Sequence, residues 1–222
     1  MTLRDNVFTI LLVLDLAISG VREVISGRYV NFAATAVFLC TLLHPTDALA
    51  HFVAGGSGFS TGFFHPVLGP DHLLAMISVG IISAQMGGRA VWAVPATFVS
   101  VMAVGGSLGA VGAPLPLIEY GIVISVIALG AAIASGKKMP PKIAYGFVGL
   151  FAIFHGYAHG MEMPIIAEPL FYAAGFMLST ACLHLIGVAI GFAAVYTRAG
   201  AFALRNCGAA ICAFGFYLIL AN

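Results

Sequence analysis

Six long apolar segments, separated by short polar stretches, dominate the sequence after residue 51. Each segment is close to or longer than the ~20 residues with which an α-helix crosses the hydrocarbon core of a bilayer. We therefore predict an all-α integral membrane protein with six transmembrane helices. The predicted spans cover about residues 55–86, 91–109, 115–135, 143–163, 168–196 and 203–221.

The first apolar segment is interrupted by Pro66 and by the pair Gly69-Pro70. Proline lacks a backbone N–H, and it disfavours the α-helical region for the residue before it. We therefore predict that the first span is discontinuous at Gly69-Pro70. Irregular backbone at membrane depth is tolerated only where it is buried in protein or lines a polar cavity.

The composition agrees with a membrane protein and excludes a soluble domain. Hydrophobic residues make up 61% of the 222-residue chain and charged residues only 8%, so the chain cannot supply a water-exposed surface. The formal net charge is +1 and the sequence contains no basic patch. Nucleic acid is therefore not an expected partner.

The basic residues after position 51 lie in or directly beside alternate loops. They follow the first, third and fifth predicted spans, and none follows the second or fourth. By the positive-inside rule, these three loops face the cytoplasm, so both ends of the region 51–222 are expected outside. The residues are Arg89, Lys137, Lys138, Lys142, Arg198 and Arg205.

Residues 28–50 resemble a signal peptide that is placed late in the chain. Arg28 is followed by an apolar run over residues 32–43 and by an Ala-x-Ala ending at residues 48–50. Cleavage there would leave His51 as the first residue, and an uncleaved helix is the alternative. Residues 1–27 are expected to be a cytoplasmic or interfacial extension, or the product of an over-long reading frame. The region 51–222 is then one transmembrane domain.

Four of the seven histidines and two of the eight acidic residues lie in two short strings within apolar segments. Ionisable groups at membrane depth are costly and therefore candidates for function. In the second string, His155, His159 and Glu162 share a narrow stripe of one helix. Imidazole nitrogens with a carboxylate form a partial ligand set for nickel, cobalt, zinc or copper.

The first string adds His65, Asp71 and His72 on both sides of the Gly-Pro break. Asp71 has three interpretations. It is a metal ligand, the N-cap of the half-helix that follows, or a partner that orients His72 or His65 through a ring N–H. The two strings together predict an intramembrane metal site of six residues.

Three further residues are secondary candidates. Glu119, near the start of the third span, is a ligand, a proton carrier or an interfacial residue. His184 stands alone in the fifth span, where a hydrogen-bonded core histidine is the alternative to a ligand, and its loss is expected to be milder than loss of the strings. His51, if cleavage exposes it, offers an amine and an imidazole for metal capture from outside.

At the two strings the chain resembles the HupE/UreJ family of nickel permeases. The family pattern is His, five residues, Asp-His in the first span, followed by His-Gly-x-Ala-His-Gly-x-Glu. The chain matches it at His65, Asp71, His72, His155, His159 and Glu162, and it resembles the family around Glu119 and His184. The resemblance covers residues 51–222, whereas residues 1–27 depart from it.

This resemblance implies a permease of the bacterial inner membrane that imports nickel, sometimes cobalt, for enzymes such as hydrogenase or urease. The ion is the cargo, so no prosthetic group and no enzymatic activity are expected. Expected partners are the divalent ion and membrane lipid; a homo-oligomer and handover to nickel chaperones stay open. The alternative is an intramembrane zinc hydrolase, in which the same residues hold zinc and Glu162 acts as general base.

Overall fold

The computed structural model describes residues 58–161 and 168–221, and these residues form seven α-helices and no strand. The predicted signal-like segment 28–50 and the extension 1–27 lie outside the described residues. The helices are α4 (Gly58–Leu68), α5 (Pro70–Met86), α6 (Ala90–Ala110), α7 (Ile118–Ser135), α8 (Pro141–Met161), α9 (Pro169–Val195) and α10 (Arg198–Ala221).

Helices occur in all six segments in which the apolar pattern predicts them, which confirms the all-α prediction for the described residues. By length and composition, α6, α7, α9 and α10 are candidate membrane spans, and the α4–α5 pair passes the same test together. Helix α8 has 21 residues but is less apolar, because two histidines interrupt it. The count of six spans therefore stays a prediction.

The first span is broken where the sequence predicts it. Helices α4 and α5 meet at an angle of 81°. Gly69 lies between them in an extended conformation (φ −87°, ψ 113°), and Pro70 is the first helical residue of α5. Pro66 remains inside α4. The Gly-Pro pair, rather than Pro66, therefore produces the break, because Gly69 leaves the helical region before proline.

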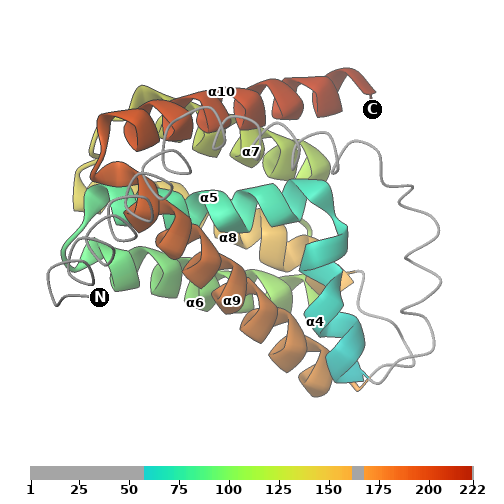
Figure 1. The fold of residues 1–222 in the computed structure, drawn as a ribbon. Coiled ribbons are helices and arrows are strands. Elements are labelled where there is room, and N and C mark those ends of the chain that lie inside the picture. The colour runs from blue at the N-terminus through green and yellow to red at the C-terminus, as the bar shows by residue number, and fades with distance from the viewer. Residues whose placement is uncertain (1–57, 162–167, 222) are drawn as a thin grey trace, which may run out of the picture.

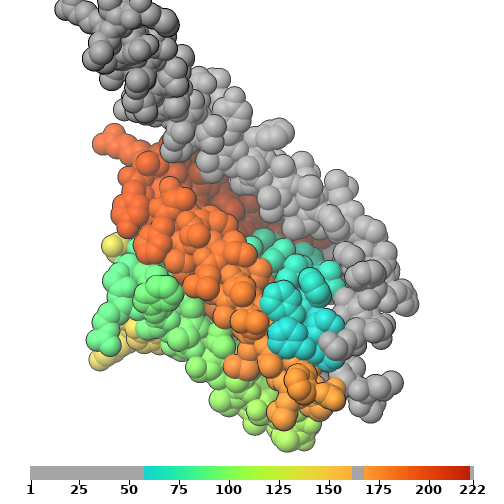
Figure 2. Space-filling view, turned by 60° about the horizontal axis from the view of Figure 1, so that its bottom comes forward, coloured from blue at the N-terminus to red at the C-terminus, as the bar shows by residue number. Residues whose placement is uncertain are grey.

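Glycines allow the helix pairs to approach closely, as expected in lipid. The α6–α8 pair shows this best: a Cβ on Gly156 would lie 2.0 Å from the Met102 carbonyl oxygen, and one on Gly160 would lie 2.2 Å from that of Gly106. Helix α4 packs on α9 in the same way, since a Cβ on Gly62 would lie 2.1 Å from the Tyr172 carbonyl oxygen. Figure 2 shows these two helices side by side.

Helix α5 runs through the middle of the bundle, with α7 and α10 on one side and α6 and α9 on the other (Figure 1). Its fully buried residues Ala75, Met76 and Val79 contribute to a core shared with α6 to α10. Met76 is therefore a packing residue. The start of α5 is therefore positioned by a helix that packs into this core along most of its length.

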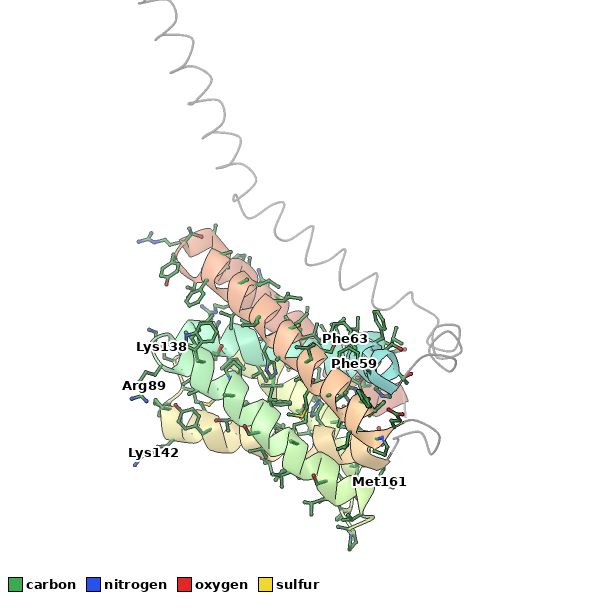
Figure 3. All side chains as sticks on the ribbon, turned by 90° about the horizontal axis from the view of Figure 1, so that it is seen from below. Phe59, Phe63, Arg89, Lys138, Lys142 and Met161 are labelled. Carbon is green, nitrogen blue, oxygen red and sulfur yellow. The ribbon has the colours of Figure 1, made fainter. Side chains whose placement is uncertain are left out.

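Basic residues gather at one end of the bundle. Figure 3 places Arg89, Lys138 and Lys142 there, with Met161 toward the opposite end. Arg205 belongs to the same group, since its Nε–H donates to the carbonyl oxygen of Ala134 in the last turn of α7 (3.0 Å). We call this the basic end, and the opposite one the histidine end.

Candidate metal site

Four imidazoles from three helices meet near the histidine end. The centroids of the His65 and His159 rings lie 4.6 Å apart, and those of His72 and His159 lie 4.4 Å apart. The His72 ring is also 5.1 Å from that of His155. The two strings predicted from the sequence are thus brought together, and we call these four residues the histidine cluster.

The break in the first span makes this convergence possible. His65 lies before the break, in the last turn of α4, and His72 lies after it, in the first turn of α5. The 81° bend lets both approach His159 from different helices. A straight helix would place two residues seven apart about two turns, roughly 10 Å, along one face.

Asp71 holds the ring of His72. Its Oδ1 accepts hydrogen bonds from the backbone N–H and from Nδ1–H of His72, both at 2.8 Å. Because an ionised carboxylate only accepts, Nδ1 carries the ring hydrogen and the lone pair lies on Nε2. A carboxylate that orients an imidazole in this way is the usual companion of a metal-binding histidine.

The N-cap interpretation of Asp71 is wrong. Gly69 occupies the N-cap of α5, and no side chain caps that helix. Asp71 is in the first turn instead, where its carboxylate accepts one of the N–H groups that have no partner within the helix. Pro70 at the first position shifts the helix start ahead of the aspartate.

His155 is anchored by the backbone of its own helix. Its Nδ1–H donates to the carbonyl oxygen of Phe151 (3.0 Å), and the side chain is 0% exposed. The carbonyl can only accept, so the hydrogen is on Nδ1 and the lone pair on Nε2. Among the described residues, this Nε2 has no hydrogen-bond partner. A buried, fixed imidazole with an available nitrogen is suited to a metal ligand.

The cluster adjoins a cavity of about 350 Å³ between α6, α8 and α9. His159 is in its wall, close to the ring of Phe176 (centroids 4.0 Å apart). Met102 and Tyr172 also line it. The cavity therefore extends from the level of His159 to that of Met102 on α6.

The imidazoles of the cluster meet in pairs rather than as a closed cage. Within residues 58–161 and 168–221, no three His, Cys, Asp or Glu side chains are disposed so that together they could hold a metal ion. The predicted ligand Glu162 and the secondary candidate His51 lie outside the described residues. The six-residue site thus stays a prediction, of which the structure brings the histidine part together.

The two remaining secondary candidates lie in contrasting places. Glu119 is exposed in the first turn of α7 at the histidine end, which agrees with its interfacial interpretation. His184 is 1% exposed in α9, and neither ring nitrogen has a hydrogen-bond partner among the described residues. The prediction offered a hydrogen-bonded core histidine as the alternative to a ligand at His184, and the described residues provide no such hydrogen bond.

Sequence reasoning missed the aromatic residues that surround the histidines. Phe98 of α6 contacts both His155 (5.7 Å between centroids) and His184 (5.2 Å), and Phe176 contacts His159. Phenylalanines are common in apolar spans, so nothing in their spacing singles these two out. Only the packing of α6 and α9 against α8 assigns them.

Two comparisons with known proteins place the chain in a family. It matches the family described as HupE/UreJ protein over residues 39–218. It is also 39% identical over 191 residues to Protein HupE of Rhizobium leguminosarum bv. viciae, covering 86% of this chain and 99% of that protein. No solved structure matches the chain significantly.

These findings agree with the resemblance predicted from the two strings, and they give no support to the zinc hydrolase alternative. The apolar helices and the family together indicate a multi-pass membrane protein. The chain belongs to the HupE/UreJ family, an accessory, permease-type family rather than a known family of enzymes.

Proposed function

We propose that this protein is a permease that imports nickel, with cobalt as a second cargo, across the bacterial inner membrane. The observation that carries the proposal is the histidine cluster: four imidazoles from α4, α5 and α8 meet inside a bundle of apolar helices. Membership of a family associated with nickel and with hydrogenase and urease supports nickel as the ion.

The chemistry of the cluster suits transfer better than storage. Neutral imidazole nitrogens bind nickel and cobalt well, and a closed cage would retain the ion. Conduction needs sites that bind strongly enough to admit the ion but weakly enough to release it. Imidazoles that meet in pairs along α8 offer such sites in succession, with Glu162 as the predicted first ligand at the outer end.

The proposal includes six spans, counting α4–α5 as one and α8 as another. The common position of the basic residues at one end supports an orientation with that end in the cytoplasm. The histidine end and both ends of the region 51–222 then face outward. Nickel would enter at the histidine end and leave at the basic end.

The test is uptake of radioactive nickel by proteoliposomes that contain the purified chain. Wild type is compared with His155→Ala and with Phe147→Ala, a similar truncation on α8 away from the cluster. We expect uptake by wild type and the control and none by His155→Ala, with cobalt competing better than zinc. Absence of nickel uptake by well-folded wild type would contradict the proposal.

A further inference from the structure

His184 is a buried imidazole for which the cluster provides no role. It is among the largest side chains that are fully buried, and both of its ring nitrogens lack a hydrogen-bond partner within the described residues. Burying polar atoms without a partner costs free energy, so such a group needs an explanation. His155 differs, because the backbone of α8 satisfies its Nδ1.

A polar and a soft side chain lie about one helical turn from the contact between His184 and Phe98. Thr180 is one turn earlier on α9 and fully buried, and its hydroxyl donates to the sulfur of Met102 on α6 (3.9 Å). Phe98, one turn before Met102, contacts the His184 ring. The pairs 180/184 and 98/102 therefore face each other across the α6–α9 contact. The imidazole of His184 and the contact between the Thr180 hydroxyl and the Met102 thioether therefore lie one turn apart on the same side of the α6–α9 contact.

This group lies deeper in the bundle than the histidine cluster. His184 is fifteen residues into α9, roughly 22 Å along that helix at 1.5 Å per residue. His159 is two residues from the end of α8, roughly 3 Å by the same measure. On the other side, eleven residues separate His184 from the end of α9. His184 is thus near the middle of the bundle.

A continuous series of contacts joins the two levels. The His155 ring contacts Phe98, and Phe98 contacts His184. The cavity beside His159 is also lined by Met102, the sulfur partner of Thr180. The cluster and the deeper group are therefore linked through the Phe98 ring, and the cavity beside His159 reaches Met102.

We propose that His184, Met102 and Thr180 form a second, deeper binding station for a borderline divalent metal ion such as nickel or cobalt. The proposal rests on the proposed transport function and extends its path. The nearest described carboxylate to the cluster, Asp71, is engaged with His72, and the deeper station has only neutral donors. A thioether and an imidazole favour borderline and soft ions over magnesium or calcium, and a neutral set releases its ion readily.

The test uses the full chain in proteoliposomes and in detergent. His184→Gln is compared with wild type and with Leu183→Val, a packing control at the next position of α9. We expect nickel uptake to fall about tenfold in His184→Gln. Loss of a group that supports metal binding typically lowers affinity or activity by about 10–100-fold, and this estimate is the lower end of that range. Equilibrium dialysis with nickel should show one bound ion fewer than in wild type, and affinity at the cluster should be unchanged.

Wild-type uptake and wild-type stoichiometry in His184→Gln would overturn the proposal. If that variant does not fold, Met102→Leu and Thr180→Val decide, because each keeps the side-chain volume and removes one donor. If folded Met102→Leu takes up less nickel relative to zinc than wild type does, the result supports the station. If nickel uptake by both Met102→Leu and Thr180→Val equals that of wild type, the proposal is overturned. If wild type takes up no nickel, the proposed function fails. The station is then still tested by equilibrium dialysis, which compares the number of nickel ions bound by wild type and by His184→Gln.

Discussion

Two imidazoles, His155 and His184, are almost completely buried but differ in their surroundings. His155 has its Nδ1 bonded to the backbone of α8 and lies beside His72. His184 has no hydrogen bond within the described residues and contacts Phe98. This hydrogen bond fixes the first ring in one tautomer, and no hydrogen bond from the described residues does so for the second. Burial alone therefore does not define the role of a membrane histidine; the hydrogen bonds around it do.

After His155→Ala, which should abolish uptake, the largest effect is expected from removing the carboxylate that orients His72. In Asp71→Ala, the His72 ring loses its carboxylate partner. We therefore expect nickel uptake to fall by about 100-fold, which is the upper end of the loss usually caused by removing a hydrogen-bond partner of a metal-binding histidine. Glu168→Ala is the matched control, since Glu168 is an exposed carboxylate at the start of α9 near the same end. Nickel uptake by proteoliposomes is measured for both variants, Asp71→Ala and Glu168→Ala. Equal uptake by the two variants would show that Asp71 has no special role.

A smaller loss is expected from Asp71→Asn. The amide oxygen still accepts a hydrogen bond from His72, but the negative charge is gone. We expect uptake to fall by about tenfold, between wild type and Asp71→Ala. If the asparagine variant were as inactive as the alanine variant, the charge rather than the orientation of His72 would be the essential contribution.

The close packing behind the cluster can be tested with two glycines of α8. Gly156→Ala would place a methyl group 2.0 Å from the Met102 carbonyl oxygen, whereas Gly149→Ala meets only Val101 at 3.9 Å. We expect Gly156→Ala to destabilise the fold by about 1–3 kcal/mol, as overpacking does. Thermal unfolding in detergent should show a lower midpoint for Gly156→Ala only. Equal midpoints would mean that α6 and α8 adjust without cost.

The smallest effect is expected at the basic end. Arg205→Ala removes the bond from Nε–H to the Ala134 carbonyl, which is exposed, so stability should change by less than about 1 kcal/mol. We expect uptake to stay close to that of wild type, because Arg205 is exposed at the end away from the histidine cluster and its loss leaves the fold nearly as stable. The same proteoliposome assay measures it. A loss as large as that of Asp71→Ala would place an essential step at this end instead.

Much of the fold could be predicted because hydrophobic pattern and proline chemistry act locally. The six apolar segments became helices, and Gly69-Pro70 broke the first of them, since a residue before proline avoids the helical region. Hydropathy alone does not select α8 as a span, because its histidines lower its mean hydropathy. The role of Asp71 as N-cap was wrong, because Pro70 moved the start of α5 to an earlier residue.

The sequence by itself determined that this is a helical membrane protein whose unusual ionisable residues lie in two strings, and the strings alone indicated its family. Only the tertiary structure decided which imidazoles meet, which nitrogen His72 and His155 present, and that Phe98 contacts both His155 and His184. The reason is physical. Spacing along one helix sets which residues share a face, but contacts between helices depend on the 81° bend and on glycines that admit a neighbouring backbone.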